Sequence, residues 1–270
     1  MKQHIYWHTT VQLPDDSDLT PVPSKVDVAI IGGGYTGLSA ARTLAKQGVS
    51  VAVLEAETIG WGASSRNGGM TLTGLKPAMQ TVIKNYGRDL AKELFQCSLD
   101  SVNIVEQIVK EENIDCGFSR YGHLLTANKP KHYESLQGEV NFMAKEFNHN
   151  VRLVSPKDLR SEIGTDVYHG ALVDEVSGGL NPAQYVAGLA GAAARAGAIL
   201  CARARVTKIE RRENRFLIQT ERGKVEAESV LVATSGYTGN ATKTLQKKII
   251  PIGSFIIATE QLSDELANEL

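Results

Sequence analysis

One segment, Val26–Glu55, constrains the fold of this chain more than any other part of its sequence. It consists of an apolar run, a glycine-rich turn, an amphipathic stretch and a second apolar run that ends in a carboxylate. The turn carries Gly32, Gly34 and Gly37 in the G-x-G-x-x-G spacing, and this spacing between a strand and a helix is typical of a dinucleotide-binding βαβ unit. The sequence therefore predicts an α/β protein with a Rossmann-type parallel sheet.

The glycine turn has the features of a pyrophosphate site. Gly32 permits a tight turn, Gly34 lets backbone N–H groups come close to phosphate oxygens, and Gly37 lets the helix pack on the strand. The helix is expected to begin near Tyr35, and its positive end would face the phosphates. The candidate contacts in this turn are Gly32, Gly33, Gly34, Tyr35, Thr36 and Gly37.

The acid at the end of the second apolar run limits the choice of dinucleotide. Glu55 lies 23 residues after Gly32 (55 − 32), where a carboxylate can accept hydrogen bonds from an adenosine ribose. A 2′-phosphate about 4 Å away would be repelled by roughly 4 kcal/mol at an effective dielectric near 20, which disfavours NADP. NAD and FAD share the adenosine half, so this unit alone leaves both open.

The segment after Glu55 is a glycine-rich loop of small and polar residues, which could follow an extended ligand. Its pattern is Gly60-x-Gly62-Ala63-Ser64-x-Arg66-Asn67-Gly68-Gly69. This pattern resembles the D-amino-acid oxidase/sarcosine oxidase superfamily of FAD-dependent amine oxidoreductases, and within it the gamma-glutamylputrescine oxidoreductase-like branch. The resemblance implies FAD as the cofactor, with the loop beside its pyrophosphate, ribityl chain and flavin ring. The implied contacts are Ala56, Gly62, Ala63, Ser64, Ser65, Arg66, Asn67, Gly68 and Gly69.

Two later segments are similar to the same family. The stretch from Asn181 to Ala198 resembles the helix that re-enters the FAD domain, and a strand-like stretch from 199 to 209 follows it. The resemblance implies that Val206 contacts the adenine side of the cofactor. Residues 229–238 resemble the strand and turn that cross near the dinucleotide, which adds the candidate contacts Thr234 and Gly236.

The resemblance also implies the domain layout, in which an FAD domain is interrupted by an inserted α+β substrate domain. After a leader at 1–24, we expect the FAD-binding domain at 25–75 and 177–246. The substrate domain is expected at 76–176 and 247–270. Members of the family continue beyond the equivalent of Leu270, so the resemblance implies that this chain lacks a C-terminal part.

Local patterns predict several elements outside the βαβ unit. Apolar residues at helical spacing predict helices within 75–113 and over 130–147, and a strand is expected at 121–126. Ser155 followed by Pro156 is typical of a helix start, with Ser155 as the N-cap. Residues 249–260 are expected to form a strand that returns to the substrate domain, and a helix is expected to begin near Asp264.

Composition excludes several classes of partner. The chain of 270 residues has 29 Lys+Arg and 30 Asp+Glu, and a net charge of −1 argues against nucleic acid and against an anionic membrane. No apolar stretch reaches the length of a membrane span, and the N-terminus lacks the pattern of a signal peptide. Three cysteines in no C-x-x-C or zinc spacing predict a reduced, cytoplasmic setting, with Cys97 in the core. The histidines form no metal pattern.

The resemblance implies the oxidation of a C–N bond of an amine or amino acid, with hydride transfer to flavin N5 and with oxygen or another electron acceptor as the second substrate. Arg66 is the candidate catalytic residue, since its charge could stabilise the reduced flavin; a phosphate contact or a surface salt bridge is the alternative role. Some relatives attach FAD through a histidine where this chain has Arg66, so noncovalent FAD is expected, although a cysteine linkage further along stays open. Tyr121, His123 and Tyr237 are candidate substrate contacts.

Two other functions are compatible with parts of the sequence. An NAD-linked dehydrogenase of ordinary Rossmann type should lack the Gly60–Gly69 loop and the strand at 230–236, and this chain has both. A catalytically inactive FAD- or nucleotide-binding fragment is the other alternative, because of the expected missing C-terminal part. The substrate itself is open among polyamine conjugates, N-methyl amino acids and D-amino acids.

Overall fold

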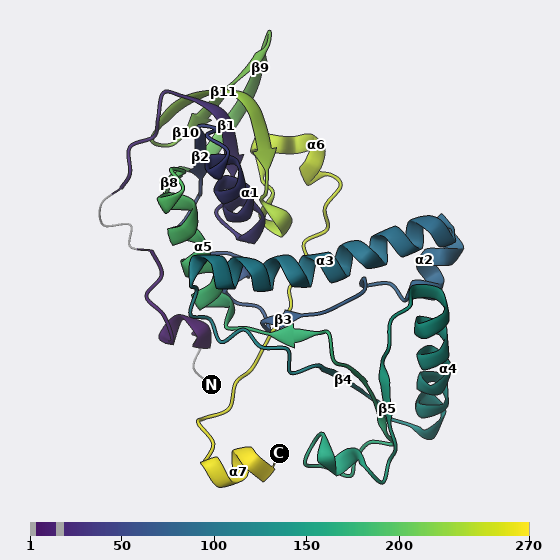
Figure 1. The fold of residues 1–270 in the computed structure, drawn as a ribbon. Coiled ribbons are helices and arrows are strands. Elements are labelled where there is room, and N and C mark those ends of the chain that lie inside the picture. The colour runs from purple at the N-terminus through teal and green to yellow at the C-terminus, as the bar shows by residue number, and fades with distance from the viewer. Residues whose placement is uncertain (1–3, 15–18, 270) are drawn as a thin grey trace. The chain divides into compact units, whose positions relative to one another are not determined.

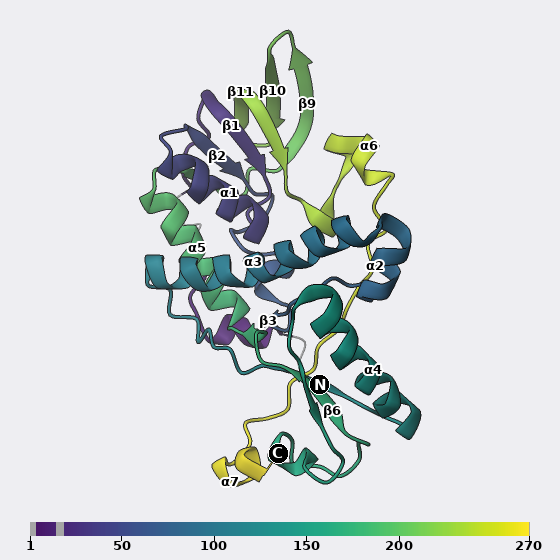
Figure 2. The same ribbon diagram turned by 45° about the vertical axis from the view of Figure 1, so that its right-hand side comes forward.

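The structure is a computed structural model that describes residues 4–14 and 19–269 (Figures 1 and 2). The expected leader at 1–24 lies partly outside these residues. The chain folds into two compact units. The first comprises Met1–Gly68, Val109–Cys116 and Asn181–Ile256, and the second comprises Gly69–Ile108, Gly117–Leu180 and Ile257–Leu270.

The first unit contains a six-stranded sheet. Its strands are β1 (Lys25–Ile31), β2 (Val51–Leu54), β8 (Ile199–Cys201), β9 (Val206–Arg212), β10 (Arg215–Thr220) and β11 (Gly223–Val232). They lie in the order β8-β2-β1-β11-β10-β9. The first four run parallel, and β10 pairs antiparallel with both β11 and β9. This arrangement confirms the expected Rossmann-type sheet.

Two helices cover part of this sheet and pack against each other (Figure 1). They are α1 (Tyr35–Lys46), which connects β1 to β2, and α5 (Pro182–Arg195), which precedes β8. Ile30 and Val53 of the sheet share a buried cluster with Ala41 of α1 and Ala193 of α5. The small alanines let both helices approach the sheet closely. The unit also contains the short elements η1 (Tyr6–Thr9), η2 (Ala63–Ser65), η4 (Ser235–Tyr237), η5 (Asn240–Thr242) and α6 (Lys243–Gln246).

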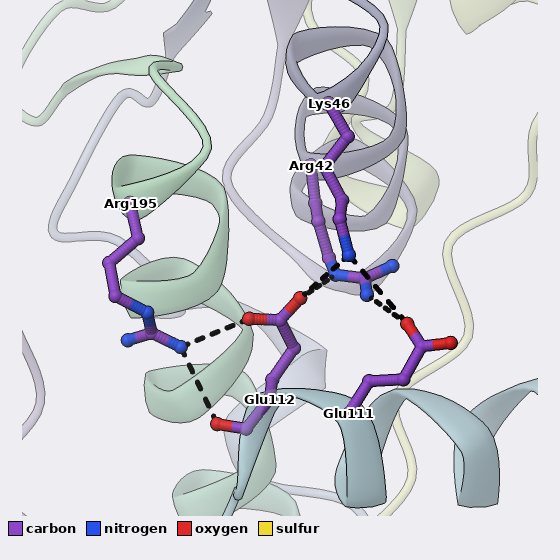
Figure 3. A network of polar contacts seen from close by, with 5 residues as sticks. All are labelled: Arg42, Lys46, Glu111, Glu112 and Arg195. Carbon is purple, nitrogen blue, oxygen red and sulfur yellow. Dashed lines mark hydrogen bonds and ion pairs between the residues drawn. The ribbon is translucent and has the colours of Figure 1, made fainter.

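An ion-pair network joins α1 and α5 to the segment 109–116 (Figure 3). Arg42 of α1 is buried and donates to Glu112 at 2.7 Å and to Glu111 at 2.6 Å. Glu112 also accepts from Arg195 of α5 at 3.1 Å and from Lys46 at 3.3 Å. Burial alone would raise the pKa of Glu112, but its hydrogen bonds to these cations lower it. The network therefore holds both helices to one pair of carboxylates.

The second unit is built on a three-stranded antiparallel sheet in the order β4-β6-β5, formed by β4 (His123–Thr126), β5 (Arg152–Val154) and β6 (Ala171–Asp174). The helix α4 (Pro130–Phe147) packs on this sheet through Leu136 and Tyr133. The other elements are β3 (Met70–Thr71), α2 (Met79–Tyr86), α3 (Arg88–Glu112, whose last residues belong to the first unit), η3 (Leu159–Ser161), β7 (Gly178–Gly179) and α7 (Asp264–Glu269).

A buried polar cluster lies at the end of β6. Asp174 is 6% exposed and accepts hydrogen bonds from the Thr73 hydroxyl and the Val176 N–H, and it lies 3.1 Å from His149 Nε2. Burial alone would raise the pKa of Asp174, but its hydrogen bonds to His149, Thr73 and Val176 lower it to about 2. The cluster is therefore an anionic centre whose partners compensate for its removal from water.

Four local expectations were wrong, two of them in the first unit. The strand-like stretch 199–209 is broken between β8 and β9, where Arg203 has φ +52°. There the Arg203 and Ala204 N–H groups donate to the carbonyl oxygens of Glu57 and Glu55, so the backbone turns towards the end of β2. Residues 249–260, of which 249–256 belong to this unit, form no strand, since no β-ladder pairs them with any described strand.

The other two errors lie in the second unit. Ser155 is not a helix N-cap, because its hydroxyl donates to Asp158 at 2.6 Å and closes a turn before η3. Cys97 is exposed rather than buried. Phe95 faces the core, and a residue two positions later on an α-helix points about 200° away from it. The helix expected near Asp264 is present as α7.

Candidate cofactor site

The glycine turn lies where three parallel strands end. The Gly32 N–H donates to Leu54 at the end of β2 at 3.0 Å, and the Ala233 N–H after β11 donates to Ile31 at 2.8 Å. Gly32 has φ +108°, and a Cβ there would lie 2.6 Å from the Ala233 carbonyl oxygen. A Cβ at Gly37 would lie 2.0 Å from the Gly32 carbonyl oxygen. Only glycine fits at these two positions, which is what a close approach of helix, turn and strand requires.

The N-terminus of α1 has no acid in its first turn, and its N-cap residue Gly34 has no side chain. The Tyr35 N–H donates to Ser64 Oγ at 3.0 Å, and a Cβ at Gly34 would lie 2.8 Å from the same oxygen. The Ser64 hydroxyl therefore lies at the positive end of the helix, where phosphate oxygens are favoured. Thr36 follows Tyr35 and is exposed.

Glu55 stands at the end of β2 beside this turn. One carboxylate oxygen accepts from the Gly33 N–H at 2.6 Å, and the other accepts from the Glu57 N–H at 2.9 Å. A carboxylate has about four lone-pair sites, so acceptor capacity remains for ribose hydroxyls. The Ala204 N–H donates to the Glu55 carbonyl oxygen at 2.7 Å, which brings the chain before Val206 and β9 to the same end of β2.

The loop after Glu55 is held by its own side chains. Asn67 donates to the carbonyl oxygens of Ala63 at 3.1 Å and Ser64 at 3.2 Å, which closes η2. The guanidinium of Arg66 lies 4.5 Å from the Trp61 ring centre and donates to the Trp61 carbonyl oxygen. Arg66 Nε is buried without a hydrogen-bond partner among the described residues. An unpaired donor of this kind suits an anionic group of a ligand.

The third side of the site is the turn after β11. Ser235 has φ +47°, and Thr234 Oγ1 lies 2.7 Å from Thr238 Oγ1. The ring of Tyr237 meets the Trp61 ring at a centroid distance of 5.6 Å, and a Cβ at Gly62 would lie 3.2 Å from the Tyr237 ring. The expected contacts Thr234 and Gly236 therefore lie on the same side of the unit as the glycine turn and the loop.

Other predicted residues belong to the second unit. Gly69 has φ +71° and accepts from the Leu180 N–H at 2.9 Å. Tyr121 is 80% exposed, and His123 begins β4. The predictions for these three residues stay predictions. Among the described residues no group of three or more His, Cys, Asp or Glu side chains could hold a metal ion.

Sequence reasoning missed the short helix η1, which contacts the loop. The Trp7 indole N–H donates to the Asn67 carbonyl oxygen at 2.9 Å, and His8 Nε2 lies 2.8 Å from Ser65 Oγ. Burial lowers the pKa of His8, and the positive charge of Arg66 lowers it further. The only signal in the sequence was the presence of Trp7 and His8 in a polar, proline-containing stretch. No spacing rule connects these two residues with Asn67 and Ser65, which lie 57 or more positions away.

Comparison with known proteins agrees with this geometry. Residues 27–270 match the family described as "FAD dependent oxidoreductase" (DAO). The chain belongs to the DAO family. Membership confirms the expected resemblance and the expected FAD cofactor. The buried unpaired Arg66 Nε, the start of α1 without an acid in its first turn and the glycine turn fit a dinucleotide of this kind.

Several DAO relatives are similar over most of this chain. Gamma-glutamylputrescine oxidoreductase of Escherichia coli (strain K12) is 35% identical over 245 residues, which cover 90% of this chain and 57% of that protein. Probable oxidoreductase OrdL of Haemophilus influenzae (strain ATCC 51907 / DSM 11121 / KW20 / Rd) is 32% identical, with coverage of 90% and 58%. The chain thus spans a little over half the length of these curated relatives.

Solved structures show the same fold. Glycine oxidase from Geobacillus kaustophilus superposes with a TM-score of 0.67 at 24% identity, covering 83% of this chain and 59% of that one. L-amino acid deaminase from Proteus vulgaris, with its specific insertion sequence deleted, gives a TM-score of 0.70 at 18% identity, covering 87% and 58%. In the part of the chain that the structure describes, no helix has the length and apolar character to cross a membrane.

Proposed function

We propose that this chain supplies the FAD-binding part of an oxidoreductase that oxidises the C–N bond of an amine or amino acid. The observation that carries the proposal is the convergence of the Gly32–Gly37 turn, Glu55 and the turn after β11 at the carboxyl ends of three parallel strands. In sheets of this type, ligands bind outside the carboxyl ends of the strands. Family membership supplies the identity of the ligand.

The proposed roles follow from position. The turn and the start of α1 would bind the pyrophosphate, with the Ser64 hydroxyl beside it, and Glu55 would accept from the adenosine ribose. The loop residues Ala63 to Gly68 would follow the ribityl chain, and Val206 would contact the adenine side.

Within the proposal, the first unit is the FAD-binding domain and the second is the substrate domain. The units differ from the expected domain bounds because 109–116 and 247–256 belong to the first unit, and 69–75 and 177–180 belong to the second.

The chemistry follows from the proposed cofactor. FAD, bound noncovalently, would supply two-electron oxidation of a neutral amine to an imine by accepting a hydride, and oxygen or another acceptor would be the second substrate. Arg66 would supply a positive charge for the reduced flavin. Trp61 fixes the Arg66 guanidinium, because its ring stacks on that group and its carbonyl oxygen accepts a hydrogen bond from it. The backbone N–H groups near Gly68 and Gly69 would add further donors.

The proposed substrate class is a gamma-glutamylputrescine-like amine, with N-methyl and D-amino acids as neighbouring candidates. The activity named for the 35% identical relative supports the first, and that named for glycine oxidase supports an amino acid. We place the reaction in the cytoplasm within this proposal, in keeping with three cysteines that fit no C-x-x-C or zinc spacing.

An absorbance spectrum of the purified chain tests the proposal. We expect flavin bands that are released on denaturation, because no covalent link is proposed, and that are bleached when gamma-glutamylputrescine is added without oxygen. Glu55→Gln places an amide opposite the Gly33 N–H, and we expect it to weaken FAD binding tenfold or more. Glu57→Gln is the matched control, since Glu57 pairs with Arg203 and Arg205 instead, and should stay within about twofold. A colourless chain that FAD cannot reconstitute, or a chain that binds NAD, would contradict the proposal.

A further inference from the structure

The N-terminal helix η1 is fastened to the cofactor loop and to the start of α5. Trp7 and His8 contact the loop through Asn67 and Ser65, as described above. The Thr10 hydroxyl accepts from Asn181 Nδ2 at 2.8 Å, although the two residues are 171 positions apart. Gln184 Nε2 also donates to the Thr10 carbonyl oxygen at 3.4 Å. Four hydrogen bonds thus tie one short segment to two parts of the chain that lie far from it in sequence.

His8 is the close partner of Ser65. Ser65 is fully buried, and its hydroxyl has one other contact, a long one of 3.5 Å to the Gly62 carbonyl oxygen. Burial and the charge of Arg66 lower the pKa of His8, which favours the neutral imidazole, and a neutral Nε2 can accept a hydrogen bond from the Ser65 hydroxyl. Without His8, a buried hydroxyl would be left with only a marginal hydrogen bond, and such a group favours a different conformation of its loop.

Trp7 holds the loop on the C-terminal side of Arg66. Its indole N–H fixes the carbonyl group of Asn67, whose side chain holds the carbonyl oxygens of Ala63 and Ser64. Arg66 lies between the two anchored residues, and its Nε is the buried donor without a partner. The backbone on both sides of Arg66 is therefore held by η1.

We propose that Trp7 and His8 are positioning residues of the cofactor site: they hold Ser65 and Asn67, and through them Arg66, in the arrangement that receives FAD. This inference rests on the proposed function only in that FAD is the ligand. The hydrogen bonds of the Trp7 and His8 side chains go to the loop and not to the glycine turn or Glu55. The proposed role of both residues is therefore to fix the conformation of the loop.

Titration of the purified chain with FAD, followed by quenching of flavin fluorescence, tests the inference. We expect His8→Ala and Trp7→Phe each to raise the Kd for FAD at least tenfold. His8→Gln keeps a polar partner for Ser65 and should restore most of the affinity. Thr9→Ala is the matched control, because its exposed hydroxyl donates to the Tyr6 carbonyl oxygen at 2.8 Å and has no other hydrogen bond to the described residues. Its Kd should stay within twofold. Far-UV circular dichroism and the urea midpoint identify any variant that fails to fold.

Hydrogen exchange of the ligand-free chain separates this inference from the proposed function. We expect faster exchange of the amides at 63–67 in His8→Ala and Trp7→Phe, and no change in Thr9→Ala. A wild-type chain that binds no FAD would refute the proposed function, while faster exchange in the variants would still support the anchoring of the loop. Unchanged exchange in folded His8→Ala and Trp7→Phe, or wild-type FAD affinity in both, would overturn the inference.

Discussion

Arg42→Met is expected to destabilise the first unit, because it removes the cation at the centre of the network that joins α1 and α5 (Figure 3). Arg42 is 6% exposed and donates to Glu112 and Glu111. A hydrogen bond to a charged group contributes about 1.5–3 kcal/mol. Methionine keeps an aliphatic stem in place of the arginine stem, so the change removes the donors with little loss of packing.

The two carboxylates are expected to respond differently. The Glu111 side chain is 40% exposed, so water can replace its partner. The Glu112 side chain is 13% exposed, and it keeps Arg195 at 3.1 Å and Lys46 at 3.3 Å. The loss should therefore be smaller than the sum of two charged hydrogen bonds, and we expect the free energy of unfolding to fall by about 2–3 kcal/mol.

Urea unfolding followed by far-UV circular dichroism measures this loss. Arg195→Met is the matched control: its side chain is 61% exposed, and its removal should cost less than about 1 kcal/mol. Arg42→Met combined with Glu112→Leu should recover part of the stability, since no partly paired buried charge remains. A loss for Arg42→Met no greater than that for Arg195→Met would refute the reasoning.

Acid provides a check on the same network. The pKa of Glu112 lies below its ordinary value of 4.5 in the folded chain. Its contribution to stability is therefore complete above about pH 4.5 and is lost as the pH falls through the lower folded pKa. The difference between the wild type and Arg42→Met should shrink over that range, and a constant difference would contradict the assignment.

Gly37→Ala is expected to lower the thermal midpoint and to abolish FAD binding, because its Cβ would lie 2.0 Å from the Gly32 carbonyl oxygen; wild-type FAD affinity would refute this. Gly138→Ala lies in α4, where a Cβ meets nothing within 4 Å, so we expect a gain of about 0.5–1 kcal/mol in urea unfolding. Asp174 has a pKa of about 2 against an ordinary 3.8, a difference that corresponds to about 2 kcal/mol. That stability is present above pH 3.8 and is lost as the pH falls towards 2. Asp174→Asn should flatten this acid limb, as unfolding at several pH values would show.

The glycine spacing predicted the turn because much of its cause is local and steric. Gly32 has a positive φ, and a Cβ at Gly37 would meet the Gly32 carbonyl oxygen five residues earlier. The contact of Gly32 with the Ala233 backbone adds a constraint from a distant part of the chain. Apolar periodicity placed α1 and α4 for a similar reason, since helical spacing is a property of neighbouring residues. The loop pattern after Glu55 gave the family by resemblance, and the match over 27–270 confirms it.

Exposure and strand continuity were predicted less well, because they depend on packing. Cys97 carries the side chain of a core residue, but the rotation of α3 set by Phe95 turns it outward. The stretch 199–209 has the residues of one strand, yet Arg203 adopts a positive φ where the backbone meets the end of β2. A pattern in neighbouring residues cannot predict where another helix or strand will pack against them.

By itself the sequence determined the βαβ unit, the position of Glu55 and the dinucleotide turn, because these follow from sterics and periodicity within about thirty residues. Only the tertiary structure decided that Trp7 and His8 meet the cofactor loop and that Arg42 lies between Glu111 and Glu112. These contacts join residues 57 to 70 positions apart. Which residues meet in these contacts depends on how helices and loops pack around the sheet. No regular spacing in the sequence predicts such contacts.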